Sequence, residues 1–178
     1  MDNNPEQEVY QLIYDDVENY GYYGRSNHGE KALKPILDLN PASILDVGCG
    51  HNDFILMARE AGIKKATGVD FACPSADFVC DILNLPFENK EFDFITAWDV
   101  LEHLLPEQVE PCFKEMSRVS RRFAFTIAHV PAGTPPPPKF KGHNLHQCVK
   151  EPVWWQTEIE KFGTVSPSNG LFWLGEWN

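Results

Sequence analysis

Two glycines and two aspartates have the spacing expected of a site that holds a nucleoside. Gly48 and Gly50 follow the apolar run 43–47, and a turn built on glycines lets the backbone approach a ligand closely. Asp70 comes twenty residues after Gly50 and ends a second apolar run, where a carboxylate can accept hydrogen bonds from a ribose diol. With Asp46 just before the glycines, this spacing predicts a nucleoside-containing cofactor.

The charge of that cofactor separates two alternatives. Asp53 stands where the fingerprint of a nicotinamide dehydrogenase has a third small residue, and a carboxylate there would repel a pyrophosphate. A cofactor without phosphate and with positive charge fits better, because Asp46 could attract it directly or through water. A dehydrogenase remains an alternative on these residues alone.

The elements that must position these residues alternate along the chain. Short apolar runs, typical of strands, alternate with stretches of helical spacing from residue 43 onward. This order predicts an α/β fold with an open, mainly parallel sheet and helices on both faces, in which ligands bind beyond the carboxyl ends of the strands. The expected strands are 43–47, 66–70, 78–80, 92–97 and 122–128, and the expected helices are 7–19, a second one around 33–37, 54–61, one that begins at 106, and 151–162.

Two segments near the end of the chain have a different character. The stretch 131–138 contains five prolines and a glycine, which favour an extended loop over helix or sheet. The turn residues 168–170 separate 164–165 from 171–177, a pattern that predicts a terminal hairpin.

Four motifs, in order, resemble those of the class I methyltransferases that depend on S-adenosyl-L-methionine (SAM). The resemblance covers roughly residues 20 to 163 and is carried by 45–50 (LDVGCG), 68–70 (GVD), 80–82 with 85–87 (CDI and LPF), and 92–95 followed by 98–104 (FDFI and WDVLEHL). Many members have a third glycine where this chain has Asn52, a residue type that tolerates a left-handed backbone.

The resemblance implies a fold and a domain organisation. The fold is a Rossmann-like seven-stranded sheet, mainly parallel, with a C-terminal antiparallel hairpin. We expect one domain over residues 1–178, with a helical cap over 1–40 and a lid or acceptor loop over 131–150.

The resemblance also implies which residues hold SAM. Asp70 would bind the ribose, Asp81 would meet the adenine amine while its neighbour's backbone holds the ring, and Tyr23 would close over the cofactor. The complete expected set is Tyr23, Asp46, Gly48, Cys49, Gly50, Asp70, Phe71, Asp81, Ile82, Trp98 and Asp99.

Two histidines are the candidates for catalysis. The SAM sulfonium already activates the methyl group, so a general base matters chiefly when the acceptor is a hydroxyl, and histidine suits that task. His103 lies just beyond the fourth strand, and His146 lies in the region that shapes the acceptor pocket in similar enzymes. Their structural alternatives are a packed or capping histidine and a residue that pins a loop.

A divalent metal is a further possibility in this region. Asp99, Glu102 and His103 look like the set by which some members, including quinone and small-RNA 2'-O-methyltransferases, hold a metal. Glu-His at this place is also widespread in metal-independent relatives, where it is structural. We therefore assign no metal from the sequence.

Composition limits the partners. The net charge of -11 and a pI near 4.9 argue against a nucleic-acid partner and favour a small-molecule acceptor. Five cysteines without a paired spacing predict free thiols, and with no apolar run of membrane-spanning length we expect a cytoplasmic protein without membrane contact.

The expected function is methyl transfer from SAM to an oxygen of a metabolite or sugar. Alternatives are a metal-assisted RNA 2'-O-methyltransferase and a non-catalytic SAM-binding protein of the same fold. The acceptor and the oligomeric state stay open.

Overall fold

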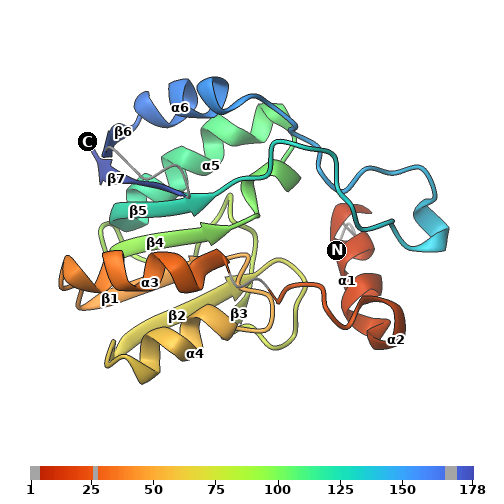
Figure 1. The fold of residues 1–178 in the computed structure, drawn as a ribbon, viewed down its shortest axis with the longest axis horizontal. Coiled ribbons are helices and arrows are strands. Elements are labelled where there is room, and N and C mark those ends of the chain that lie inside the picture. Colours follow the sequence, from red (N-terminus) through yellow and green to blue (C-terminus); the bar gives the residue numbers. More distant parts are fainter. Residues whose placement is uncertain (1–4, 26–27, 167–171) are drawn as a thin grey trace.

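The computed structural model describes residues 5–25, 28–166 and 172–178, and its centre is a seven-stranded sheet (Figure 1). The strands are β1 (Ser43–Val47), β2 (Lys65–Asp70), β3 (Phe78–Val79), β4 (Phe92–Trp98), β5 (Ser120–Thr126), β6 (Gly163–Ser166) and β7 (Trp173–Trp177). Their order is β3-β2-β1-β4-β5-β7-β6, in which β7 runs antiparallel to both of its neighbours and the other pairs are parallel. The predicted fold class is thereby confirmed.

Helices cover both faces because the sheet residues alternate between two apolar clusters. On one face, Leu45 and Ile95 pack with α5 (Pro106–Val119) and α6 (Pro152–Glu160). On the other face, Ile44 and Phe94 pack with α3 (His28–Asp38) and α4 (Asp53–Glu60). The two clusters bury β1 and most of β4, whereas Phe78 and Val79 of the edge strand β3 are exposed.

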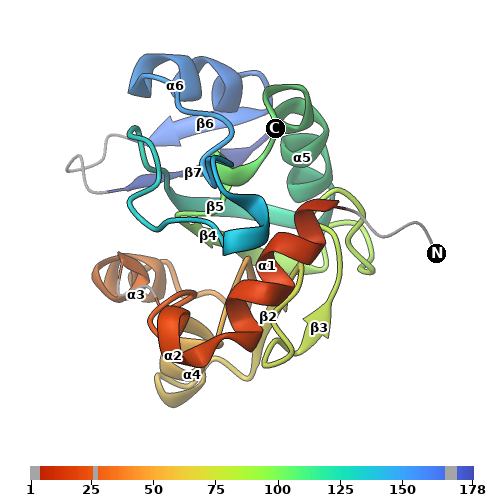
Figure 2. The ribbon, with the colours of Figure 1, turned by 90° about the vertical axis from the view of Figure 1, so that its right-hand side faces the viewer.

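A smaller unit lies beyond those carboxyl ends. Helices α1 (Pro5–Asp15) and α2 (Val17–Tyr20) pack on the segment 132–145, which contains the short 3₁₀ helix η2 (Pro138–Phe140) (Figures 1 and 2). Four buried residues form the centre of this unit: Val9, Ile13, Tyr20 and Leu145. We call α1, α2 and residues 130–146 the cap.

Several boundaries differ from the sequence prediction. The expected helix 7–19 is broken at Asp16, whose carboxylate accepts a hydrogen bond from the Asn19 amide and caps α2. The fifth strand begins at Ser120, two residues before the expected start, and ends at Thr126. The hairpin of β6 and β7 is present, whereas the predicted turn 168–170 lies outside the described residues.

All five cysteines are free thiols, four of them buried and Cys80 partly exposed. In the part of the chain that the structure describes, none of the helices combines the length and the apolarity needed to cross a membrane.

Candidate active site

A cavity of about 420 Å³ lies between the carboxyl ends of the strands and the cap. Nearly all of the residues expected to bind the cofactor line it, together with both candidate catalytic histidines. The predicted residues that line it are Tyr23, Asp46, Gly48, Cys49, Asp70, Phe71, Asp81, Ile82, Trp98, Asp99, His103 and His146.

Gly50 is the predicted residue that does not line the cavity. It instead supports the loop after β1, which carries lining residues. Its φ of 51° lies in the left-handed region, and a Cβ there would collide with the carbonyl oxygen of Gly24. Its amide donates a hydrogen bond to Asp70 Oδ2 at 3.0 Å. Gly50 therefore lets the loop after β1 pack against the chain that leaves the cap.

Asp70 at the end of β2 organises this loop. Its Oδ1 accepts hydrogen bonds from the amides of Ala72 and Cys73 at 2.9 and 2.8 Å, and its Oδ2 accepts the Gly50 amide. The Tyr14 hydroxyl of α1 also donates to Oδ2, at the longer distance of 3.3 Å. A ribose hydroxyl could replace this long contact without disturbing the amides, so the carboxylate fits the role predicted for it.

Asp46 is a buried carboxyl at the edge of the cavity. It is 2 % exposed, and the Thr96 hydroxyl donates to its Oδ1 at 2.6 Å. Burial raises the pKa of Asp46 to about 8, and the Thr96 hydrogen bond opposes that rise. A cationic group in the adjoining cavity would favour the ionised carboxylate, which fits the sulfonium and ammonium of SAM.

Apolar and aromatic lining residues suit the flat base of a nucleoside. Asp81 accepts a hydrogen bond from the Leu83 amide at 2.9 Å, which holds the turn after β3. Ile82 and Phe71 add apolar surface to the same cavity. Trp98 packs against Phe54 with ring centroids 5.0 Å apart, and its buried indole Nε1 has no hydrogen-bond partner among the described residues.

The two histidines meet at the cap end of the cavity. His103 belongs to the 3₁₀ helix η1 (Leu101–His103), and its ring centroid lies 4.8 Å from that of His146. His103 Nδ1 lies 2.8 Å from the Leu145 carbonyl oxygen and 2.9 Å from the Tyr10 hydroxyl. Burial, with His146 nearby, lowers the pKa of His103 to about 4, so its ring is neutral at neutral pH.

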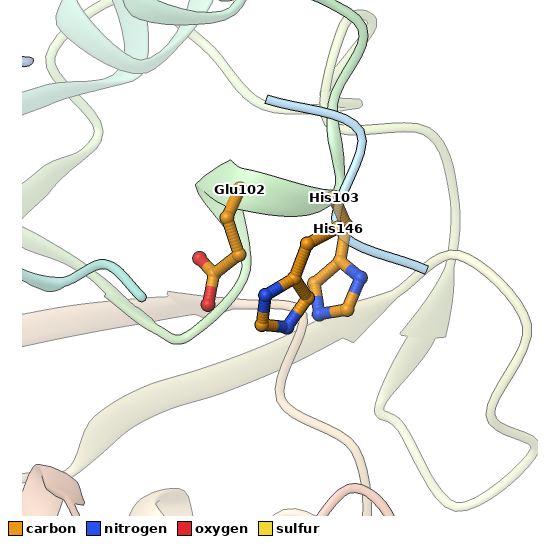
Figure 3. Close-up of side chains that lie close together, drawn as sticks. All are labelled: Glu102, His103 and His146. Carbon is orange, nitrogen blue, oxygen red and sulfur yellow. The ribbon is translucent and has the colours of Figure 1, made fainter. Parts of the chain in front are cut away.

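Glu102 lies next to these rings, whereas Asp99 is not part of the same cluster. Glu102 is fully buried, and its Oε1 accepts the Ala128 amide at 3.1 Å. Burial raises the pKa of Glu102 to about 8. Glu102, His103 and His146 each place one ligand atom within 4.8 Å of the others (Figure 3). Asp99 lines the cavity with a left-handed φ of 56°.

Two tyrosines of α1 were missed by the sequence prediction. Tyr10 contacts His103, and Tyr14 contacts Asp70, so each reaches one end of the cavity. They are four residues apart, a spacing that places two side chains on one helical face. The prediction used the apolar stripe with Val9 and Ile13, which packs inside the cap, and passed over the tyrosine pair beside it.

Comparison with known proteins supports one family. Residues 45–125 match the family model described as a methyltransferase domain. A Bos taurus protein named "Probable tRNA methyltransferase 9B" is 27% identical over 133 residues, which cover 67% of this chain and 29% of the bovine protein. The chain therefore spans less than a third of the length of that curated relative.

Solved structures show the same fold over nearly the whole chain. A protein of Pyrococcus horikoshii OT3 superposes with a TM-score of 0.68 at 17% identity, covering 95% of this chain and 97% of that one. The 1,6-didemethyltoxoflavin-N1-methyltransferase of Burkholderia thailandensis, solved with bound 1,6-didemethyltoxoflavin and S-adenosylhomocysteine, has a TM-score of 0.63 at 20% identity and coverages of 97% and 88%. The match over residues 45–125 makes this part of the chain similar to a methyltransferase domain, in agreement with the motif order, and the solved structures show the same fold.

Proposed function

We propose that this domain transfers the methyl group of SAM to an oxygen atom of a small-molecule acceptor. The observation that carries the proposal is the shared cavity, in which Asp46 and Asp70 line one end and His103 lines the other. Its volume of about 420 Å³ is near the lower end of the range usual for small-molecule sites, which favours a small acceptor.

The residues have separate tasks in such a transfer. SAM supplies an electrophilic methyl group on a sulfonium, which becomes a neutral thioether when the acceptor oxygen takes the methyl. Asp70 holds the ribose, and Asp46 favours the positive charge of the donor. Tyr10 and Tyr14 close the cavity from α1 and exclude water, which would otherwise compete with the acceptor.

We assign the acceptor side to the two histidines. With His103 Nδ1 beside the Leu145 carbonyl, the ring would carry its proton on Nδ1 and use Nε2 as the acceptor for a substrate hydroxyl. His146 lies against this ring and lines the same cavity. These placements support an oxygen acceptor more than a nitrogen or carbon acceptor, because the hydroxyl has a proton to lose.

RNA is the second candidate acceptor. The name of the bovine relative specifies tRNA, and the match covers two thirds of this chain. Against it stands the net charge of -11, since RNA binding relies on basic surface. The two acceptors are separated by incubating the protein with methyl-labelled SAM and either total tRNA or a small-molecule extract. Transfer of the label to tRNA would contradict the small-molecule proposal and favour RNA as the acceptor.

A non-catalytic SAM-binding protein is the third candidate. It shares the cofactor residues, so only turnover distinguishes it. Tight SAM binding without methyl transfer to tRNA or to any fraction of the extract would favour it.

Asp70→Ala tests the cofactor assignment. Loss of the carboxylate leaves the amides of Gly50, Ala72 and Cys73 without their acceptor and removes the ribose contact. We expect SAM affinity to fall by about 100-fold, measured by calorimetric titration, which corresponds to about 2.7 kcal/mol. Asp38→Ala is the matched control, because Asp38 forms an exposed ion pair with Lys34 on α3. Equal affinity of Asp70→Ala and the parent protein would contradict the assignment.

A further inference from the structure

Three side chains that bind metals well in other proteins converge where the cap meets the sheet. Glu102 and His103 come from η1, and His146 comes from the cap segment 43 residues later. One ligand atom of each lies within 4.8 Å of the other two, and Figure 3 shows the three side chains directed into one space. The sequence had suggested Asp99, Glu102 and His103, so the structure replaces Asp99 with His146.

Both imidazoles are held by their Nδ1 atoms on main-chain carbonyls. His103 Nδ1 lies 2.8 Å from Leu145 O, and His146 Nδ1 lies 2.6 Å from Val130 O. A carbonyl oxygen only accepts, so both contacts require an Nδ1–H donor. In the neutral form each ring then has its lone pair on Nε2. The His103 ring also has a main-chain hydrogen-bond contact with Asp99, which an ion would have to replace. A hydrogen bond from the second ring nitrogen to a carbonyl is the usual support of a metal-binding histidine.

Glu102 offers the third ligand atom. Its Oε1 accepts the Ala128 amide, while Oε2 is buried without a hydrogen-bond partner among the described residues. An unsatisfied carboxylate oxygen in a buried position is costly, and native structures rarely keep one without a reason. A hydrogen bond from an imidazole N–H to Glu102 Oε2 would satisfy this oxygen, but no such bond is present among the described residues.

We propose that Glu102, His103 and His146 bind a divalent first-row transition metal ion of the Zn²⁺ type. Two imidazole nitrogens and one carboxylate suit such an ion better than Mg²⁺, which prefers oxygen ligands and bound water. Metal–ligand distances of about 2.0–2.2 Å place neighbouring ligand atoms roughly 3.4 Å apart. The side chains therefore have to close by about an ångström around the ion.

The position of the site gives the ion a use. His103 and His146 line the cavity, so further coordination positions would face the acceptor space. There the ion would act as a Lewis acid that lowers the pKa of an acceptor hydroxyl, whose proton would pass to water before the oxygen takes the methyl group and the sulfonium becomes a neutral thioether. His103 would then serve as a ligand instead of a proton acceptor. This use rests on the proposed function, whereas binding of the ion does not.

The test measures metal binding without SAM or acceptor. The full chain is stripped with a chelator and titrated with Co²⁺, whose visible absorption reports imidazole coordination, and Zn²⁺ is then added as competitor. We expect one Co²⁺ per chain, displaced by Zn²⁺ and not by millimolar Mg²⁺. Failure here would refute the metal site and leave the methyltransferase proposal intact, because SAM binding is measured separately.

Two variants and one control assign the ligands. Glu102→Gln keeps an oxygen for the Ala128 amide, and His146→Ala removes one imidazole; each should weaken Co²⁺ binding at least 100-fold. His143→Ala removes a nearby histidine of the same segment that contacts Glu6 and Gln147, and it should bind Co²⁺ as the parent does. Thermal melting and SAM affinity show whether each variant is folded. If His146→Ala does not fold, Glu102→Gln alone tests whether this cluster binds the ion. Co²⁺ binding that survives Glu102→Gln, or that His143→Ala weakens equally, would overturn the proposal.

Discussion

The two ends of the cavity are built by different means. The cofactor end is formed by turns that follow β1, β2 and β4, strands held between two large apolar clusters. The end proposed for the acceptor combines His103 of η1 with the cap, whose own cluster has four buried members. The difference suggests a division of labour: the sheet keeps the place for the methyl donor, and a smaller unit with its own apolar cluster helps to shape the place for the acceptor.

Core truncations give the largest expected effects and test this comparison directly. Ile95→Ala, in the centre of β4, should lower the free energy of unfolding by about 3–4 kcal/mol. Ile13→Ala removes an equally buried side chain from the cap. We expect the cap to open before the sheet unfolds, so Ile13→Ala should change the main transition by less than about 1 kcal/mol.

Calorimetric melting and hydrogen exchange measure both variants. Ile13→Ala should speed amide exchange in α1 and α2 while β4 keeps its protection. Equal shifts of the main transition in the two variants would show that cap and sheet unfold as one unit and would break the comparison.

A substitution at the contact between the two regions should have an intermediate effect. Gly50→Ala adds a Cβ that collides with the Gly24 carbonyl, at a left-handed φ. We expect a loss of roughly 1–3 kcal/mol of stability and at least tenfold weaker SAM binding, because the loop after β1 has to move. Gly62→Ala is the control: its φ of 99° is also strained for alanine, but nothing lies within 4 Å of the added Cβ. It should lower the melting temperature and leave SAM affinity unchanged.

A pH dependence of stability is expected from the sheet end. The pKa of Asp46 is raised to about 8 in the folded protein, so between about pH 4 and pH 8 the folded state retains a proton that the unfolded chain has lost. Stability contributed at this site therefore falls as the pH rises through that window.

Asp46→Asn removes this dependence while the amide oxygen keeps the Thr96 hydrogen bond. In the absence of SAM, the melting temperature of the variant relative to the parent should increase from pH 5 to pH 8. A difference in melting temperature that stays constant from pH 5 to pH 8 would mean that Asp46 is ionised over this whole range. The surroundings of Asp46 would then be more polar than its burial implies.

Much of the sheet half could be predicted from the sequence. The bounds of β1 agree with the apolar run 43–47, and β2 and β4 differ from their predicted bounds by one residue at one end. Asn52 adopts the left-handed backbone expected where the family has glycine, with φ 66°. These features depend on local periodicity and on glycine positions, which neighbouring residues determine.

The cap could be predicted only in part. Its first helix was expected, but the break at Asp16 depends on one side chain that bonds back to the Asn19 amide. The tyrosine contacts with Asp70 and His103 join residues 56 and 93 positions apart, and no local pattern carries such information.

By itself, the sequence predicted the open, mainly parallel sheet through its alternation of elements, and it predicted a nucleoside-containing cofactor through glycines and aspartates at strand ends. Those signals are local, because parallel strands bring all their carboxyl ends to one edge. Only the tertiary structure decided that His146 joins Glu102 and His103, that Asp99 stays outside this cluster, and that α1 lines the cavity. The physical reason is that a loop without periodicity is placed by its contacts with distant residues, here the packing of the cap on itself and its hydrogen bonds to the sheet.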